Sequence, residues 1–255
     1  MIVSVLNNKG GTGKTTSAVN IAAATAQRGK KTLLVDLDPQ GNATTGLGFE
    51  KATLPATIYN VLSQTRRADE AMLGTKVENL WLIPSNLDLA GAEVELSSAP
   101  GREYLLREAL ATSKGNYDTI VIDCPPNIGL LTLNALVASD LLLIPVQCEY
   151  YPMEGLPTLL KVMDLVKSRL KTEFDYRILL TMYDRRTALS RRVLEQVRTN
   201  FDERVMKTVI PRSVRMAEAP SKGQPGIVFR PKNTASEQYR SAARELLETP
   251  PLAHA

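Results

Sequence analysis

The fold of this chain is decided by the stretch Lys9-Gly10-Gly11-Thr12-Gly13-Lys14-Thr15-Thr16. An apolar run over residues 1–6 precedes it, and small and apolar residues from Ser17 to Gln27 follow it. A strand, a glycine-rich turn and a helix in this order predict a phosphate-binding loop, because glycines let backbone N–H groups approach an anion and the helix adds unpaired N-terminal donors. In such a loop Lys14 reaches the β- and γ-phosphates, and the Thr15 hydroxyl contacts Mg²⁺.

The loop departs from the general pattern G-x-x-x-x-G-K-[ST] at one end. Asn8 stands where that pattern has its first glycine, and a second lysine, Lys9, follows it. A lone lysine in a loop is commonly a solvated surface residue, but this arrangement resembles the deviant Walker A loop of the ParA/MinD family of ATPases. The resemblance implies that ATP and Mg²⁺ are the cofactors and that Lys9 crosses a dimer interface to the partner's nucleotide. It assigns nucleotide binding to Lys9, Gly10, Gly11, Thr12, Gly13, Lys14, Thr15 and Thr16, and catalysis to Lys9, Lys14 and Asp38.

Apolar strands and helices alternate along the chain. The runs Lys31–Asp38 and Asp118–Asp123 are continuously apolar and contain acids at their ends, which is typical of parallel strands buried on both faces. The alternation predicts an α/β fold with a doubly wound, mostly parallel sheet and helices on both faces. We expect one P-loop domain over residues 1–255, with residues 250–255 as a short tail. Further helices are expected at Thr15–Arg28, Ile58–Leu62, Arg102–Thr112, Leu130–Ala138, Glu154–Leu170, Leu189–Phe201 and Ser236–Glu248, and further strands at Leu80–Pro84, Leu141–Val146, Ile178–Met182 and Thr208–Ile210.

Three acids at the ends of predicted strands are candidates for the chemistry. Asp123 occupies the position of the metal-binding acid of P-loop NTPases, although acids also cap turns at strand ends. Asp36 and Asp38 are two residues apart in one strand, so their side chains point the same way. The family resemblance assigns Asp38 to orienting or deprotonating the attacking water and Asp36 to the surroundings of Mg²⁺. The predicted metal site is therefore Thr15, Asp36 and Asp123, with a turn-capping role as the alternative for Asp36.

Later segments extend the resemblance over nearly the whole chain. Residues 147–156 resemble the family segment Q-x-E-Y-Y-x-x-E-G-L, residues 181–187 resemble T-M-Y-D-x-R-T, and residues 210–220 resemble I-P-R-N-V-R-x-x-E-A-P. These matches are to the small ParA (Soj-like) branch, which includes the McdA-type cargo-positioning ATPases, and they imply that Pro211 and Ser213 contact the adenine. The chain departs from the family twice: Ser213 replaces the usual asparagine, and Arg230-Pro231-Lys232-Asn233 replaces aspartate-proline-lysine-serine.

The composition is that of an ordinary globular protein. A hydrophobic fraction of 44% over 255 residues suits a proper core, and no apolar run is long enough to cross a membrane. Two cysteines, Cys124 and Cys148, are too few for a disulfide framework. We therefore expect a cytoplasmic protein without a membrane partner. The net charge of +4 permits binding to nucleic acid but does not establish it.

Arginines gather in one region late in the chain. On the predicted helix, residues 189, 193, 197 and 201 recur every fourth position and form the buried stripe, so arginines off that stripe face solvent. Arginine binds phosphates well, and the resemblance favours salt-dependent, non-specific binding of double-stranded DNA over a merely solvated helix face. The arginines of this region are Arg185, Arg186, Arg191, Arg192, Arg198 and Arg204. The DNA-binding candidates are Arg186, Arg191, Arg192, Arg198 and Arg215.

The resemblance implies a complete cycle. A ParA-type ATPase forms an ATP-dependent sandwich homodimer, associates with the nucleoid by binding DNA, and positions or segregates a chromosome, a plasmid or a protein organelle such as the carboxysome. A ParB-like or other cargo adaptor protein stimulates its hydrolysis. Three alternatives stay open: a MinD-like membrane-cycling regulator, a reductase like the nitrogenase iron protein, and an ATP-dependent amide or carboxylate ligase. The acidic, proline-broken end Glu245–Ala255 argues against the first, and the cysteine positions argue against the second.

Overall fold

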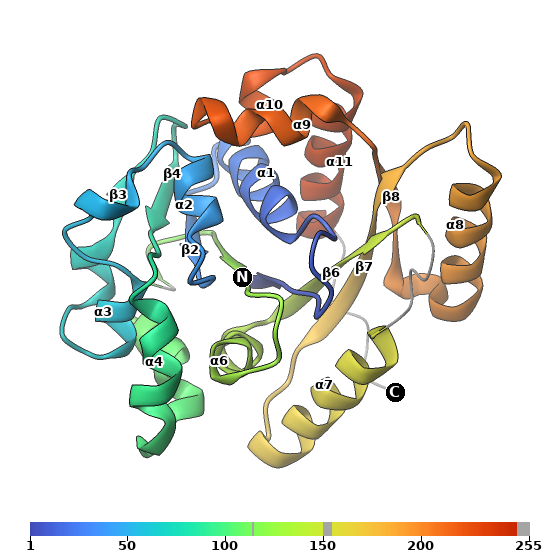
Figure 1. Ribbon diagram of the computed structural model, residues 1–255. Helices are drawn as coiled ribbons and strands as arrows, with labels where there is room; N and C mark the ends of the chain where they lie inside the picture. Colours follow the sequence, from blue (N-terminus) through green and yellow to red (C-terminus); the bar gives the residue numbers. More distant parts are fainter. Residues whose placement is uncertain (114, 150–154, 249–255) are drawn as a thin grey trace.

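The computed structural model describes residues 1–113, 115–149 and 155–248. Within these residues one eight-stranded sheet forms the centre of the molecule (Figure 1), with strand order β3-β4-β2-β5-β1-β6-β7-β8. Every neighbouring pair is parallel except β3 and β4, which are antiparallel. The strands are β1 (Ile2–Val5), β2 (Thr32–Asp36), β3 (Leu73–Gly74), β4 (Leu80–Ile83), β5 (Thr119–Asp123), β6 (Leu141–Gln147), β7 (Asp175–Tyr183) and β8 (Val205–Pro211).

Helices cover both faces of this sheet. One face carries α3, α4, α5, α6, α7 and α8, and the other carries α1, α2, α9, α10 and α11. The helices are α1 (Lys14–Gln27), α2 (Asn42–Gly46), α3 (Ile58–Leu62), α4 (Leu89–Glu95), α5 (Leu105–Ala111), α6 (Leu130–Ala138), α7 (Leu156–Leu170), α8 (Ala188–Phe201), α9 (Val214–Glu218), α10 (Gly226–Phe229) and α11 (Thr234–Glu248).

The central strands explain why their sequences are continuously apolar. Successive side chains of a strand point to opposite faces, and here both faces are packed. Leu33 and Val35 of β2 belong to the core under α3–α8, whereas Leu34 between them belongs to the core under α1 and α11. Ile120 and Val121 of β5 divide in the same way. Burying such a side chain contributes about 1.5–3 kcal/mol, so the alternation fixes the register of each strand.

The predicted fold class is confirmed, and most expected elements are present with ends that differ by a few residues. The first helix and the strands around it lie within two residues of their predicted bounds, whereas β7 is longer than predicted by three residues at its start. The sequence prediction missed α2, α4, α9, α10 and the two-residue strand β3. These are short elements, and their patterns are too brief to show a helical or strand period.

Three sequence predictions fall wholly or partly outside the described residues. The expected tail over residues 250–255 lies outside them, as do residues 150–154 of the family-like segment after β6 and the first residue of the helix expected at Glu154–Leu170. In the part of the chain that the structure describes, none of the helices combines the length and the apolar character needed to span a bilayer.

The last helix is packed into the core along its apolar side. Tyr239, Ala242, Ala243 and Leu246 of α11 are buried, and α11 lies against α1 and β8. A helix that binds a membrane surface must present its apolar face to lipid. Residues 234–248 already use that face inside the protein, which disfavours the MinD-like alternative for this segment.

Candidate nucleotide and metal site

The predicted phosphate loop connects β1 to α1 at the carboxyl edge of the sheet. Gly11 and Gly13 adopt φ values of 74° and 90°, a left-handed region that glycine reaches without steric cost. Helix α1 begins at Lys14 directly after the loop, so its unpaired N–H groups face the space that the loop encloses. The backbone therefore has the shape of an anion-binding cradle.

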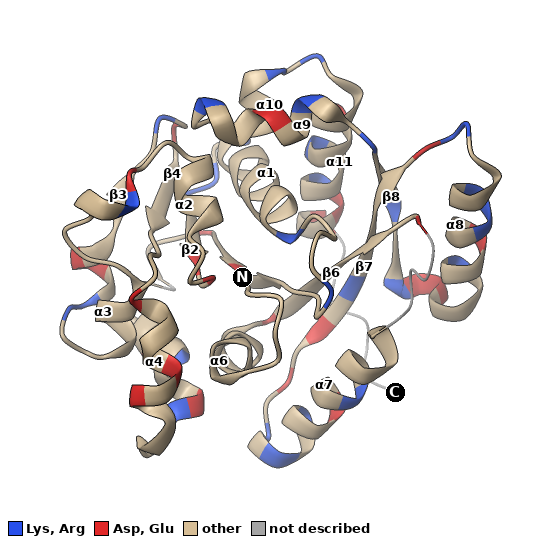
Figure 2. Ribbon diagram, viewed as in Figure 1, with Lys and Arg blue, Asp and Glu red and all other residues tan. Residues whose placement is uncertain are grey.

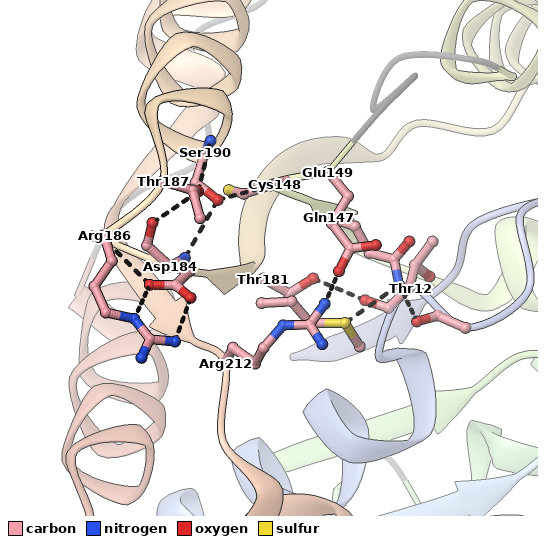
Figure 3. A network of polar contacts seen from close by, with 12 residues as sticks. Thr12, Gln147, Cys148, Glu149, Thr181, Asp184, Arg186, Thr187, Ser190 and Arg212 are labelled. Atoms are coloured by element: carbon pink, nitrogen blue, oxygen red, sulfur yellow. Dashed lines mark hydrogen bonds and ion pairs between the residues drawn. The ribbon is translucent and has the colours of Figure 1, made fainter.

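Neighbouring strands hold the backbone of this loop from one side (Figure 3). Thr181 Oγ1 of β7 donates to the Thr12 carbonyl oxygen at 2.9 Å, and Gln147 Nε2 of β6 donates to the Gly11 carbonyl oxygen. The start of the loop is held by Asn7, whose Oδ1 accepts from Lys9 N at 2.9 Å and whose Nδ2 donates to a β6 carbonyl. Hydrogen bonds thus tie the loop to two adjacent strands, β6 and β7.

The two loop lysines have different surroundings. Lys14 is 7% exposed, and its Nζ donates to the Lys9 carbonyl oxygen at 3.1 Å. Burial lowers the pKa of the Lys14 ammonium, while the charges of Asp123 and Asp38 act to raise it. Lys9 is half-buried, and among the described residues its ammonium forms no ion pair. Lys14 thus lies inside the site and Lys9 at its edge.

Asp123 is the buried acid that the structure leaves without a partner. It ends β5 next to the loop, is fully buried, and neither carboxylate oxygen accepts a hydrogen bond from the described residues. Burial raises the pKa of Asp123 well above its usual range, and the charge of Asp36 adds to the rise. Thr15 faces the carboxylate outside the geometry of a full hydrogen bond. Thr15 and the charge of Lys14 both act to lower the pKa of Asp123. An unpaired buried carboxyl is costly, so this position suits a cation.

Asp36 is buried too, but its oxygens are occupied. Oδ2 accepts from the backbone N and the hydroxyl of Thr44 at 2.8 and 2.7 Å, and Oδ1 accepts from Asp38 N at 3.3 Å. Burial raises the pKa of Asp36 to about 6, against the effect of these hydrogen bonds. The Thr44 hydroxyl also accepts from Ser85 N at 2.9 Å. Asp36 therefore anchors the loop and helix that follow β2, which is the alternative role considered for it, and its share in a metal site stays a prediction.

Asp38 lies just beyond β2, on the loop that Asp36 anchors. It is 7% exposed, and its Oδ1 accepts from Gln40 N at 2.9 Å. Its charge acts on Lys14, Asp36 and Asp123, which places all four groups near one another. The strand ends predict this convergence, because parallel strands present their carboxyl ends at one edge of the sheet. The prediction that Asp36 and Asp38 share one strand is wrong, since β2 ends at Asp36.

The residues around Asp123 fit Mg²⁺ bound together with a nucleotide. The described residues contain no cluster of three or more His, Cys, Asp or Glu side chains that could hold a metal by themselves. Mg²⁺ in NTPases usually relies on one or two protein oxygens, on phosphates and on water. Thr15 at the start of α1 and the unpartnered oxygens of Asp123 supply such a protein contribution.

A strained residue marks the end of β7 beside the loop. Met182 has φ of 53°, a conformation that costs a residue other than glycine about 1–2 kcal/mol. Its Sδ accepts from Gln147 Nε2 at 3.2 Å, and its side chain lies near Gly13. Strain of this kind persists where the surrounding structure enforces it, often at functional sites. No feature of the sequence predicts this conformation, since methionine has no turn preference.

The predicted adenine segment contains an unforeseen pair. Pro211 ends β8 and Ser213 precedes α9, both half-buried. The Ser213 hydroxyl donates to Asn233 Oδ1 at 3.3 Å, and that oxygen also accepts from Ala235 N at 2.9 Å. The two departures from the family pattern are therefore in contact. Relative to the family pattern that the sequence resembles, serine and asparagine are exchanged between these two positions. The adenine contacts of Pro211 and Ser213 stay predictions.

The candidate DNA-binding arginines lie on separate elements (Figure 2). Arg191, Arg192 and Arg198 are exposed on α8, and the predicted stripe of this helix packs against the core through Val193 and Val197. Arg186, just before α8, forms an ion pair with Asp184 at 2.7 Å, although its side chain is 82% exposed.

Two other arginines are already paired. Arg215 lies on α9 and pairs with Glu218 at 2.8 Å, so the structure does not bring it to the α8 group. Arg204 follows α8 but bonds to the buried Asp175 and stacks on Tyr176 at 4.4 Å. Asp175 is 2% exposed and also pairs with Arg177, and a buried carboxylate requires such counter-charges. Arg204 is therefore a structural residue.

A hydrogen-bonded path leads from the loop to α8 (Figure 3). Beyond Gln147 and Thr181, the carbonyl oxygen of Cys148 accepts from Ser190 Oγ at 2.9 Å. Ser190 Oγ in turn accepts from Asp184 N at 3.3 Å, and Ser190 N donates to the N-cap Thr187 at 3.2 Å. The same two strand ends thus position the phosphate loop and the start of the arginine-bearing helix. Sequence analysis did not assign roles to Gln147, Thr181 or Ser190.

The cysteines disfavour the redox alternative. Cys124 and Cys148 are both buried and free. Burial raises the pKa of the Cys124 thiol far above its usual range and that of Cys148 to about 12. Ligands of an iron–sulfur cluster are thiolates, and these two thiols lie where the thiolate form is strongly disfavoured.

Asp123→Asn tests the cost of the unpartnered carboxyl. We expect the nucleotide-free variant to unfold at or above the wild-type temperature, because the amide removes a buried acid that lacks a partner. The added stability that Mg²⁺ gives in the presence of ADP should disappear. Thermal unfolding with ADP, with and without Mg²⁺, measures both effects.

Asp175→Asn is the matched control for that substitution. This buried aspartate has arginine partners, so its neutralisation should destabilise the protein by about 3 kcal/mol. If Asp123→Asn lowered the unfolding temperature as much as Asp175→Asn does, the assignment of Asp123 as an unpaired acid would be wrong.

The Ser213–Asn233 pair predicts a rescue by exchange. Ser213→Ala should lose about 1 kcal/mol of stability, the net value of a typical hydrogen bond. The double exchange Ser213→Asn/Asn233→Ser should restore a hydroxyl–amide pair and be more stable than the sum of its two single substitutions. Urea unfolding of the wild type, Ser213→Asn, Asn233→Ser and the double exchange gives the coupling free energy between the two positions. Additive effects of the two substitutions on stability would contradict the pairing.

Comparisons with known proteins identify the family. Residues 1–176 match the family model described as AAA domain. The chain is 50% identical over 246 residues to the sporulation initiation inhibitor protein Soj of Bacillus subtilis (strain 168), which covers 96% of this chain and 97% of that protein. It is 46% identical over 248 residues to the chromosome partitioning protein ParA of Myxococcus xanthus (strain DK1622), covering 97% of this chain and 88% of that protein.

Solved structures show the same relationship. The structure of cobyrinic acid a,c-diamide synthase from Mycobacterium smegmatis with bound ATP analog and magnesium matches with a TM-score of 0.86 and 37% identity, covering 96% of this chain and 93% of that chain. Its ligands agree with the prediction of ATP and Mg²⁺ as cofactors. The loop geometry, the convergent acids and the near full-length similarity to Soj and ParA lead to one conclusion: this chain belongs to the ParA/MinD family of P-loop ATPases.

Proposed function

We propose that this protein is a ParA-type ATPase that moves or positions a cargo by an ATP-operated cycle of dimerisation and DNA binding. The observation that carries the proposal is the phosphate loop with two lysines beside a buried Asp38. One lysine lies inside the site, and the other lies at its edge and forms no ion pair with the described residues. The similarity to Soj and ParA over nearly the full length supports the same function.

ATP binds in the loop from Lys9 to Thr16. The N–H groups of the loop and of the first turn of α1 surround the β- and γ-phosphates, and Lys14 leaves the Lys9 carbonyl to contact them. Thr15 and Asp123 hold Mg²⁺, which supplies positive charge against the phosphate oxygens. Binding of Mg²⁺ and nucleotide also provides partners for groups that are costly to bury alone.

Asp38 acts on the attacking water. Its position on the loop after β2 is fixed by the hydrogen bonds of Asp36 to Thr44 and to the Asp38 backbone. A carboxylate in this position would orient the water and accept its proton as the water attacks the γ-phosphorus in line, while the bond from the γ-phosphorus to the β–γ bridging oxygen breaks and ADP leaves. Asp36 contributes by holding that loop in place.

Lys9 completes the site of a second copy. Its ammonium has no acidic partner among the described residues, and an unpaired lysine beside a phosphate site is attracted to negative charge. In the ATP state two copies face each other and each Lys9 reaches the partner's nucleotide. The γ-phosphate then serves as part of the interface, so its hydrolysis weakens the dimer.

DNA binds through the exposed arginines of α8. Arg191, Arg192 and Arg198 contact the phosphates of double-stranded DNA without reading its sequence, and Arg186 joins them if DNA displaces its partner Asp184. A dimer presents two such helices, so dimerisation on ATP raises the affinity for DNA through avidity. The protein would then reside in the cytoplasm on the nucleoid.

The cycle ends when a partner protein stimulates hydrolysis. A ParB-like or other cargo adaptor protein bound to the chromosome, a plasmid or a protein organelle such as the carboxysome would release the ATPase locally. Among these cargoes, the name of the Myxococcus xanthus relative, chromosome partitioning protein ParA, favours the chromosome.

A second candidate function follows from one comparison. The 37% identity to a cobyrinic acid a,c-diamide synthase favours an ATP-dependent amide synthase as the alternative. Such an enzyme consumes ATP only with its carboxylate substrate and an amine donor. ATP turnover that requires DNA and no small metabolite would support the partitioning function, and turnover that requires a carboxylate would support the synthase.

The DNA switch is tested with Asp38→Ala, which we expect to bind ATP without hydrolysing it. A gel shift on arbitrary duplex DNA should show binding with ATP, none with ADP or without nucleotide, and loss of binding as salt rises. Binding that is equal in all nucleotide states would contradict the switch, and binding in none would remove the DNA step.

The double substitution Arg191→Ala/Arg192→Ala, made in the Asp38→Ala variant, tests whether the exposed arginines of α8 bind DNA. Removing two phosphate contacts per subunit, four per dimer, should weaken binding on any sequence and reduce the slope of log affinity against log salt by about 4. Arg66→Ala/Arg67→Ala is the matched control, because these adjacent exposed arginines pair with Glu70 and Asp69. An equal loss of DNA affinity in both double variants would show only an effect of the reduced net charge.

A further inference from the structure

We propose that Gln147 and Thr181 are positioning residues that turn the N–H groups of the phosphate loop toward the phosphates of the nucleotide. They come from β6 and β7 and bind consecutive carbonyl oxygens of the loop, those of Gly11 and Thr12. The inference rests on the nucleotide site of the proposed function and does not depend on dimerisation or on DNA.

The geometry follows from the planarity of the peptide bond. A trans peptide holds its C=O and N–H on opposite sides. Fixing the Gly11 carbonyl toward Gln147 therefore turns the N–H of Thr12 away from β6, and fixing the Thr12 carbonyl toward Thr181 turns the N–H of Gly13 away from β7. Two successive donors of the loop are thus directed by two side chains outside it.

The order of the strands shows toward which part of the site these N–H groups point. β1, which leads into the loop, lies between β6 on one side and β5 on the other, and β2 follows β5. The two tethers come from the β6 and β7 side, whereas Asp123 and Asp36 end β5 and β2. The freed N–H groups therefore point away from the tethers, into the part of the site where Lys14 and the acids converge.

Burial makes the Thr181 tether strong. Thr181 and Thr12 are each 2% exposed, so water does not compete for this hydrogen bond, and a buried carbonyl without a donor is costly. Gln147 is half-buried, and its amide also donates to Met182 Sδ. The strained Met182 follows Thr181 and contacts Gln147, so it connects the two tethers at the ends of their strands.

The two tethers preorganise the loop for binding phosphate groups. Glycines leave the loop free to rotate its peptides, which would cost conformational entropy on binding. Tethers that select the phosphate-facing orientation in advance reduce that cost and raise the affinity for any nucleotide whose phosphates reach the loop. ADP carries the β-phosphate, whereas AMP does not.

Thr181→Val tests the tether, because valine keeps the shape and removes the hydroxyl. We expect the Kd for ADP to rise about fivefold, the equivalent of one lost hydrogen bond, while the Kd for AMP stays unchanged. Thr181→Ser, which retains the hydroxyl, should bind ADP like the wild type. Competition against a fluorescent ADP analogue, at a temperature at which every variant is folded, measures both constants.

Two further variants complete the experiment. Thr119→Val is the matched control, because Thr119 is equally buried, its hydroxyl lacks a partner among the described residues, and it starts β5 far from the loop; its ADP affinity should be that of the wild type. Gln147→Leu should raise the Kd for ADP in the same manner as Thr181→Val, and the double variant should bind ADP more weakly than either.

Three results would overturn the inference. Thr181→Val binding ADP as tightly as the wild type would show that the loop needs no tether. Equal weakening for ADP and AMP would indicate a distorted pocket. If Thr181→Ser bound ADP as weakly as Thr181→Val, packing at position 181 and not the hydroxyl would determine the affinity. Because ADP binding needs one subunit only, a failure of the DNA switch leaves these measurements unaffected.

Discussion

The structure depends on how two polar strand ends hold a glycine-rich loop. Glycines give the loop the left-handed turns that an anion cradle requires, but the same freedom makes its peptides mobile. Thr181 and Gln147 remove that freedom through hydrogen bonds to the Thr12 and Gly11 carbonyls. Their strands end at the same edge, and Ser190 ties the start of α8 to Cys148 there. The loop and the arginine-bearing helix therefore share one rigid support.

A second constraint is electrostatic. Three acids and a lysine converge at the carboxyl edge of the sheet, and burial acts against the charge of both Lys14 and Asp123. Hydrogen bonds within the protein offset the cost of burying one of these acids, because Asp36 accepts three of them. Asp123 receives none from the described residues. A site that is costly without ligand gains more from binding a cation and a polyphosphate than a site already satisfied by protein groups.

Much of the fold and the core of the candidate site could be predicted from the sequence, because their signals are local. The glycines before α1 and the apolar runs of β2 and β5 fix the loop and place the acids at one edge. What could not be predicted depends on pairs distant in sequence. Arg204 belongs to the arginine-rich region of the sequence, but only the fold shows that it bonds to Asp175. Ser213 departs from the family pattern, but only the fold shows that it contacts Asn233. The tethers of the loop likewise join residues that are more than a hundred positions apart.

We propose that this site is one half of a nucleotide-bridged pair, with Lys9 as the group that crosses. Sedimentation velocity of Asp38→Ala and of Asp38→Ala/Lys9→Ala, each with ATP and with ADP, distinguishes this arrangement from a self-contained site. We expect Asp38→Ala to sediment as a dimer of the 28.0 kDa chain with ATP only, and the double variant to bind ATP but stay monomeric. A double variant that dimerises on ATP as fully as Asp38→Ala would rule out the crossing role of Lys9, and a dimer that forms equally with ADP would rule out the bridging role of the γ-phosphate.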